Sequence, residues 1–266
     1  MLIFSGAIVL PQTLKVGFFS ARYFGLIFAL AVWAGYRLAE KRAPLFGVSA
    51  EQADNIMIWL MIGGFIGARL YHILSSLPYY LQNPVEIFIV WHGGLSVIGA
   101  LLGGLLTLCV IVIRKGYGKV PTFLDWLAPS MALGQVIGRF GDLFNYELFG
   151  YPTNLPWKMF VPEIFRPSVF AGSSFFHPLF LYESLGNAMI LWVLLKRIRP
   201  TNPGKIFFTY LMSYGILRFA LEFFRIDSVF VGALRLNAMV SLVFIASSFA
   251  YFYLSKVGGK KLKVRA

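Results

Sequence analysis

The stretch that decides the fold of this chain runs Gly134-Gln135-Val136-Ile137-Gly138-Arg139-Phe140-Gly141-Asp142-Leu143-Phe144-Asn145-Tyr146-Glu147-Leu148-Phe149-Gly150. Residues 123–132 just before it are mostly apolar, and with their continuation they are long enough to enter a membrane. Within nine residues the stretch then presents an arginine, an aspartate, an asparagine and a glutamate among glycines. Hydrocarbon tolerates so many polar groups only if they pair or face water. The pattern therefore predicts a membrane-embedded site in preference to a purely structural cluster.

The composition places the chain in a membrane. Of its 266 residues, 58% are hydrophobic and only 13% are charged, and the mean hydropathy is +0.73. The apolar residues form blocks about 20 residues long, which is the length needed to cross ~30 Å of hydrocarbon. The net charge of +13 comes from short basic clusters between these blocks, so membrane orientation explains it better than nucleic-acid binding.

The blocks predict an all-α polytopic protein, a single transmembrane domain over residues 1–266 with seven spanning helices. The expected spans are residues 22–39, 56–74, 93–113, 123–137, 179–195, 206–224 and 236–254. Residues 1–19 are broken by Pro11 and Gly17, so we expect an interfacial segment on the membrane surface. Residues 151–176 are rich in prolines, glycines and aromatic side chains, which predicts an irregular periplasmic arm or loop section.

Charge predicts the orientation. Dense Lys/Arg clusters follow spans one, three, five and seven, whereas the loop after span two has none. The positive-inside rule then puts the C-terminus in the cytoplasm and the N-terminus outside. The stretch 134–150 and residues 151–176 would lie at the outer face. No cleavable signal peptide is expected, because residues 1–10 lack a basic n-region.

The sixth expected span carries four polar groups at helical spacing. Steps of four, four and three residues place Tyr214, Arg218, Glu222 and Arg225 on one face. Glu222 could neutralise the two arginines in an internal ladder. One carboxylate cannot balance two guanidinium groups, however, and Arg139 adds a third cation at the same depth. Because guanidinium groups bind phosphate through a planar fork, the surplus indicates an anionic lipid headgroup as ligand.

Five further residues are possible members of the site. His177 precedes span five, and Tyr182 and Glu183 lie one turn inside it. Glu183 should pair with an arginine, and a packing role and a site role are equally open. Arg69, near the end of span two, has the same ambiguity, and His92 lies just before the expected third helix.

Other chemistries fit poorly. The three histidines, His72, His92 and His177, have no ligand-type spacing, and Cys109 is alone in an apolar block, so neither a metal nor a disulfide is expected. There is no phosphate-binding glycine loop and no serine-centred nucleophile motif, so no cofactor is expected either. A catalysis built from Arg, Tyr, Asn and Glu would proceed by direct displacement, with electrostatic help for a phosphate leaving group.

These motifs resemble those of the prolipoprotein diacylglyceryl transferases of bacterial inner membranes. The family signature is Gly-Arg-x-Gly-Asn-[Phe/Tyr/Leu]-x-Asn-x-Glu-x-x-Gly, and residues 138–150 match it with one departure in the fixed positions. Further elements agree in order: Trp-x-Gly-Gly-x-Ser at 91–96, His-Pro-x-x-Leu-Tyr-Glu at 177–183, and Tyr-Gly-x-x-Arg-x-x-x-Glu-x-x-Arg at 214–225. The resemblance covers almost the whole chain.

The resemblance implies a seven-span enzyme that moves the diacylglyceryl group of phosphatidylglycerol, or another anionic phospholipid, to the lipobox cysteine thiol of a preprolipoprotein. This is the first step of lipoprotein maturation; it forms a thioether and releases glycerol phosphate. The catalytic residues would be Arg139, Arg218, Tyr214 and Glu147. The phospholipid-binding residues would be Arg139, Asp142, Asn145, Glu147, Arg218, Glu222 and Arg225.

Four positions depart from the family pattern. Ile98 stands where the family has a His or Tyr, Asp142 where the signature has Asn, Phe24 where a Tyr is usual, and Ala238 where a Gln is usual. His92 lies six residues before Ile98 and does not occupy its register. The departures keep two alternatives open: a divergent paralogue that uses another acceptor or headgroup, and a catalytically silent phospholipid-binding membrane protein.

Overall fold

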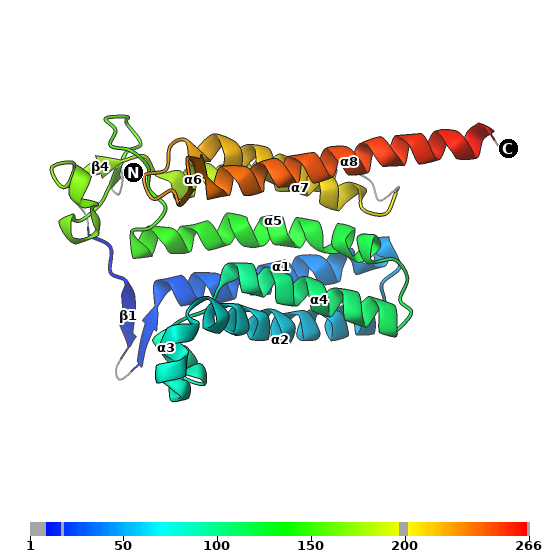
Figure 1. Ribbon diagram of the computed structural model, residues 1–266, viewed down its shortest axis with the longest axis horizontal. Helices are drawn as coiled ribbons and strands as arrows, with labels where there is room; N and C mark the ends of the chain where they lie inside the picture. The colour runs from blue at the N-terminus through cyan, green and yellow to red at the C-terminus, as the bar shows by residue number, and fades with distance from the viewer. Residues whose placement is uncertain (1–8, 17–18, 197–201, 265–266) are drawn as a thin grey trace. The chain divides into compact units, whose positions relative to one another are not determined.

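The computed structural model describes residues 9–16, 19–196 and 202–264 (Figure 1). In these ranges seven helices have 18 or more residues, and each coincides with an expected span. They are α1 (Tyr23–Arg42), α2 (Ala50–Ser75), α4 (Val97–Arg114), α5 (Val120–Asn145), α6 (Leu179–Lys196), α7 (Lys205–Glu222) and α8 (Leu236–Val264). Among the described residues, four helical segments are long and apolar enough to cross a membrane, namely Ala50–Ser75, Val97–Arg114, Leu179–Lys196 and Leu236–Lys256. That α1, α5 and α7 also span the membrane stays a prediction.

Short elements connect these helices. A single-turn helix, α3 (Leu77–Gln82), lies after α2, and the remaining turns are the 3-10 helices η2 (Ala43–Phe46), η3 (Pro84–Ile87), η4 (Val90–His92), η5 (Glu163–Phe165) and η6 (Ser168–Phe170). The described strands form three antiparallel pairs: β1 (Thr13–Val16) with β2 (Phe19–Arg22), β3 (Met159–Phe160) with β4 (Phe175–Phe176), and β5 (Phe230–Val231) with β6 (Leu234–Arg235).

Two expected regions can be compared with these elements. The β1–β2 pair occupies part of the segment expected to lie at the interface, while residues 1–8 and 17–18 lie outside the described residues. Residues 151–176, which we call the arm section, contain only two short strands and two 3-10 turns. The positions of both regions relative to a membrane stay predictions.

Four helix boundaries differ from the expected spans by four residues or more: the starts of α2 and α4 and the ends of α5 and α8. Helix α4 begins at Val97 instead of at residue 93, because Gly93 and Gly94 have φ of +98° and +81° and cannot continue a right-handed helix. Helix α5 continues past the expected end at residue 137 as far as Asn145, so Arg139 and Asp142 are helical. The charged side chains have partners there, since Arg139 donates to Glu183 of α6 and to Asp142 of its own helix.

The chain divides into two compact units. One comprises residues 39–126, in which α2 and α4 lie side by side (Figure 1). A Cβ at Gly67 would lie 2.4 Å from the carbonyl oxygen of Gly99 and 2.7 Å from Cα of Gly103. The expected role of the glycines in the third span, close approach between helices, is confirmed for Gly99 and Gly103, whereas a Cβ at Gly104 would meet nothing within 4 Å.

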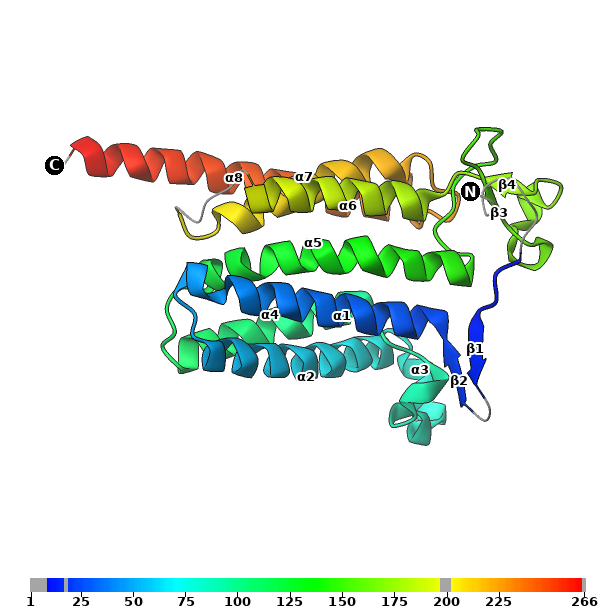
Figure 2. The ribbon, with the colours of Figure 1, turned by 180° about the vertical axis from the view of Figure 1, so that it is seen from behind.

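The other unit comprises residues 1–38 and 127–266 and contains most of the expected site residues. Polar contacts fix α5, α6 and α7 to one another: Ser184 Oγ donates to the Val136 carbonyl at 2.8 Å, and Tyr210 Oη donates to Gln135 Oε1 at 3.0 Å. Helix α8 packs along α7, as both ribbon views show (Figures 1 and 2). Helix α1 approaches α5 where the Phe24 ring lies against Gly141.

An aromatic core anchors the arm section to the end of α5. Its buried members are Leu143, Tyr146, Phe149, Met159, Val161, Phe176 and Phe180. Tyr146 and Leu148 have φ of 55° and 52°, values that few non-glycine residues adopt. The Tyr146 turn ends α5, and the Glu147 amide donates to the Asp142 carbonyl at 2.9 Å to satisfy the helix terminus.

Gly150 lies where three backbone segments meet. Its amide donates to the His177 carbonyl at 2.9 Å, and the amide of Tyr151 donates to the Phe224 carbonyl at 3.2 Å. A Cβ at Gly150 would lie 2.5 Å from the Phe224 oxygen and 3.2 Å from Cβ of His177. The last glycine of the signature is therefore required by close backbone packing.

Replacing Gly150 by alanine should lower the free energy of unfolding by about 1–3 kcal/mol, because backbone atoms cannot move aside as a flexible side chain can. Thermal unfolding in detergent measures the effect. Gly172→Ala in the arm section is the matched control, since a Cβ there would meet nothing within 4 Å. Equal melting temperatures for the two variants would contradict the packing argument.

Candidate active site

The site is centred on the carboxylate of Glu183, in the first turns of α6. Glu183 is 1% exposed. Arg139 Nη2, from α5, donates to its Oε1 at 2.7 Å, and Arg218 Nη1, from α7, donates to its Oε2 at 2.8 Å. Tyr214 Oη lies 3.5 Å from Oε1. One buried carboxylate thus bridges two guanidinium groups from two other helices.

Local sequence explains why Glu183 faces both arginines. The next residue, Ser184, bonds to the α5 backbone, and the Asn187 amide donates to the Glu183 carbonyl at 2.9 Å. On α7, Tyr214 and Arg218 are one turn apart and share a face. These contacts set the rotation of α6 so that its one carboxylate points between α5 and α7.

Glu222 is not the partner of Arg218, so the expected ladder within α7 is wrong for that residue. Glu222 is fully buried, and its nearest cationic atom is Arg225 Nε at 3.9 Å. Neither of its carboxylate oxygens has a hydrogen-bond partner among the described residues. Arg225 instead binds Asp227 in a bidentate pair at 3.0 and 2.7 Å. Asp227 was missed from the sequence, although its place two residues after Arg225 was a usable signal.

Asp142 makes the inner cluster, which consists of Arg139, Arg218, Glu183 and Asp142, neutral overall. Its Oδ2 accepts a hydrogen bond from Arg139 Nη1 at 3.2 Å. Arg139, Arg218, Glu183 and Asp142 therefore hold two positive and two negative formal charges. The cluster still has an unfilled donor, because Nε of Arg139 is buried without a hydrogen-bond partner in the part of the chain that the structure describes.

Asn145 and Glu147 lie at the end of α5, beyond this cluster. The Asn145 side-chain amide donates to Glu147 Oε1 at 3.5 Å. Partial burial, and secondarily the nearby Asp142 carboxylate, raise the pKa of Glu147 above its usual range. The two residues thus present an amide and a carboxylate beside the arginine cluster.

His177 and Tyr182 connect the arm section to α6. Tyr182 Oη accepts a hydrogen bond from Trp157 Nε1 at 2.7 Å and lies 3.1 Å from His177 Nδ1. Burial lowers the pKa of His177, which favours the neutral imidazole in this contact. Trp157 was not singled out from the sequence, because nothing in its local spacing indicates a partner 25 residues away.

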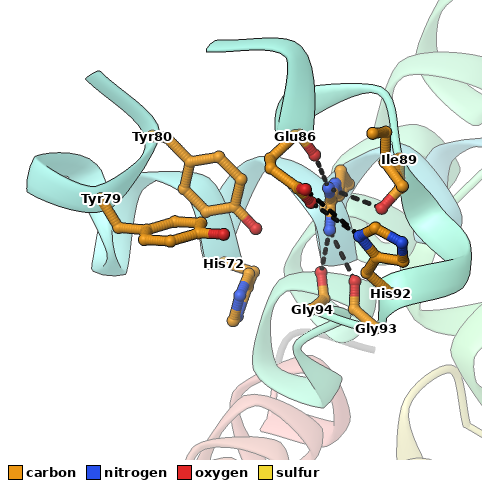
Figure 3. Close-up of a pocket in the computed structure, with 9 residues that line it drawn as sticks. His72, Tyr79, Tyr80, Glu86, Ile89, His92, Gly93 and Gly94 are labelled. Carbon is orange, nitrogen blue, oxygen red and sulfur yellow. Dashed lines mark hydrogen bonds and ion pairs between the residues drawn. The ribbon is translucent and has the colours of Figure 1, made fainter. Parts of the chain in front are cut away.

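Arg69 and His92 belong to the other unit, where they line a pocket of about 170 Å³ (Figure 3). The Arg69 guanidinium donates only to backbone carbonyls, at 3.1 Å to Ile87, 2.7 Å to Gly93 and 3.0 Å to Gly94, with further bonds to Glu86 and Ile89. His92 Nδ1 lies 3.1 Å from a Glu86 carboxylate oxygen. Arg69 therefore acts as a tie that holds residues 86–94 to α2.

Residues 11–254 match the family model described as prolipoprotein diacylglyceryl transferase. The chain belongs to this family. The resemblance inferred from the motifs is thereby confirmed.

Curated relatives agree over nearly the whole length. A protein of Gloeobacter violaceus named phosphatidylglycerol–prolipoprotein diacylglyceryl transferase is 40% identical over 236 residues, which cover 87% of each chain. Proteins with the same name from Synechococcus elongatus and Thermotoga maritima are each 38% identical, and their alignments cover 89% and 94% of this chain and 84% and 86% of theirs.

Replacing Glu183 by alanine should destabilise the protein by about 3–5 kcal/mol, because it leaves two buried guanidinium groups with one carboxylate fewer. Thermal unfolding in detergent measures this loss. Glu163→Ala, on the exposed η5 turn, is the matched control and should change the melting temperature little. A Glu183→Ala protein as stable as the control would mean that the arginines do not depend on this bridge.

Replacing Arg69 by methionine should loosen residues 86–94, because five backbone carbonyls lose their donor. Hydrogen exchange in that segment should accelerate about tenfold or more, while exchange in α6 and α7 stays unchanged. Unaltered exchange in residues 86–94 would show that Arg69 is not the tie.

Proposed function

We propose that this chain is a membrane transferase that moves the diacylglyceryl group of phosphatidylglycerol to the lipobox cysteine thiol of prolipoproteins, the first step of lipoprotein maturation. The observation that carries the proposal is the pair Arg139 and Arg218 held by Glu183, with the Nε donor of Arg139 unfilled. Two oriented guanidinium groups in a buried setting fit a phosphodiester anion. Family membership supplies the acceptor and the group transferred.

The arginines would stabilise charge where it develops. The cysteine sulfur attacks the carbon of the diacylglyceryl group that bears the phosphate. A C–S bond forms as the bond between this carbon and the phosphate oxygen breaks. The electron pair of that bond passes to the phosphate oxygen, and glycerol phosphate leaves with an additional negative charge. Arg139 and Arg218 would bind that charge more strongly in the transition state than in the ground state, which is the condition for acceleration.

The other candidate residues would orient the lipid and the acceptor. Tyr214 is within 3.5 Å of Glu183 and helps to hold the arginine bridge. Asn145 and Glu147 would contact the headgroup glycerol or the acceptor segment, and Glu222 and Arg225 would border the same site from the end of α7. Through their bonds to each other, His177 and Tyr182 would position the arm section.

The membrane arrangement is part of the proposal. The seven long helices would each span a bacterial inner membrane as one domain over residues 1–266, with the N-terminus outside and the C-terminus in the cytoplasm. Basic clusters after α1, α4 and α6 support this orientation. The arginine cluster and the arm section would then face the periplasm, where the lipobox segment of the acceptor reaches them.

A second candidate is a paralogue that uses another acceptor or headgroup. It is favoured by the Arg139–Asp142 ion pair, since the family signature has a neutral asparagine at this position. A carboxylate beside the arginine would weaken the hold on a phosphate that does not displace it.

The decisive experiment measures thioether formation by the purified protein with radiolabelled phosphatidylglycerol and a lipobox peptide as substrates. Thioether product should form, and Arg139→Ala should reduce turnover by about 100-fold or more, because a charge-stabilising donor is lost. Arg114→Ala, at the exposed end of α4, is the matched control and should retain activity. Lipid turnover without peptide modification would favour the second candidate, and lipid binding without turnover would show a silent lipid-binding protein.

A further inference from the structure

Asp142 is a buried acid that phosphate binding by itself does not require. It is 9% exposed, and its closest charged partner is Arg139 on the same helix, at 3.2 Å. Three other charged groups influence it: Glu183 from α6, Arg225 from the end of α7, and Glu147 from the turn after α5. Two of these are themselves carboxylates. Among the described residues, Arg139 is therefore the one cation hydrogen-bonded to Asp142.

The charges of the inner cluster already balance without a ligand. Arg139 and Arg218 contribute two positive charges, and Glu183 and Asp142 two negative charges. A phosphodiester that enters this site brings one more negative charge and competes with Asp142 for the Arg139 guanidinium. A buried cluster with a surplus charge is costly, and the uptake of one proton restores neutrality.

The carboxylate that would take this proton can be identified from the contacts. Glu183 is bonded to two guanidinium groups and lies 3.5 Å from Tyr214 Oη, so it keeps its bond to Arg218 when phosphate engages Arg139. Asp142 has one bond, to the same guanidinium that phosphate would claim. Displaced from Arg139, Asp142 loses its one hydrogen-bonded cation, whereas Glu183 keeps Arg218.

The reaction of the proposed function supplies one proton to be moved. The acceptor thiol must lose its proton as the C–S bond forms, and a carboxylate beside the bound phosphate can accept it. We propose that Asp142 is the general base that accepts the cysteine thiol proton in this enzyme, as phosphate binding frees its carboxylate from Arg139.

The step balances. The S–H bond breaks and its proton goes to Asp142, the sulfur pair forms the C–S bond, and the C–O pair leaves with glycerol phosphate. Asp142 then returns the proton to the departing phosphate and pairs again with Arg139. The inference rests on the proposed function, because the proton comes from the acceptor thiol of that reaction.

The test is Asp142→Asn, which keeps the side-chain shape and removes the base. At pH 7, turnover of phosphatidylglycerol with a lipobox peptide should fall about 100-fold or more. Binding of a non-transferable phosphatidylglycerol analogue should be unchanged or tighter, because Arg139 loses a competing carboxylate. Between pH 7 and 8.5 the variant's rate should rise about tenfold per unit, since the free thiol ionises with a pKa of ~8.5.

A structural role would not produce that pH profile. Asp142→Asn turnover equal to the wild type, or a variant-to-wild-type ratio independent of pH, would overturn the proposal. Asp142→Glu provides a test if the asparagine variant fails to fold. It should keep at least a tenth of wild-type turnover and the wild-type pH profile. A rate that rises with thiol ionisation in this variant would contradict the assignment of residue 142 as the base.

Two further variants separate the alternatives. Glu147→Gln tests the other nearby carboxylate as the base. If this variant alone shows a rate that rises with ionisation of the thiol, Glu147 and not Asp142 is the base. Asp54→Asn, exposed on α2, controls for the loss of one carboxylate elsewhere and should leave turnover unchanged. Failure of the wild-type protein to form thioether would refute the proposed function, whereas an active wild type with an equally active Asp142→Asn refutes only the role of Asp142.

Discussion

The bridge from Glu183 to Arg139 and Arg218 is the interaction on which the rest of the site depends. Three helices, α5, α6 and α7, each contribute one charged group to it. In a low-dielectric setting none of these groups is tolerable alone, so each helix stabilises the charge of the others. The bridge orients both guanidinium groups while leaving Nε of Arg139 unfilled. Pre-organised donors of this kind suit an anionic ligand, because little has to rearrange when it binds.

The turn that follows α5 fixes the position of the chain next to this buried bridge. Tyr146 and Leu148 adopt strained left-handed conformations, and the aromatic core beneath the arm section compensates for their cost. Gly150 then lets three backbone segments meet at a distance that no side chain permits. Asn145, the last residue of α5, and Glu147, two residues beyond it, are consequently fixed close to Asp142. Gly141 and Gly150 of the signature allow close packing, against the Phe24 ring and the Phe224 carbonyl respectively.

Asp142 distinguishes this chain from the signature that it otherwise follows. An asparagine at this position would leave the cluster with one positive charge in excess, ready for a phosphodiester. The aspartate makes the cluster neutral and ties phosphate binding to the movement of a proton. One side chain thus shifts a site of simple electrostatic attraction toward one in which binding and proton transfer are coupled.

The sequence by itself determined the helices, the membrane class, the family and most of the candidate residues. Hydropathy and span length are local properties, so every long helix coincides with an expected span, and the spaced motifs pointed to Arg139, Arg218 and Glu183. The sequence did not determine which charged side chains form ion pairs with one another. Glu222 looked like the group that neutralises Arg218 and Arg225 because it lies close to both in sequence. In the structure, Glu183 from α6 binds Arg218, and Asp227 binds Arg225. Only the tertiary structure decided this, because pairing between helices depends on their rotation and depth, which packing contacts such as Ser184 with Val136 set. The same reason explains why α5 continues as a helix beyond residue 137, where polarity alone had indicated its end.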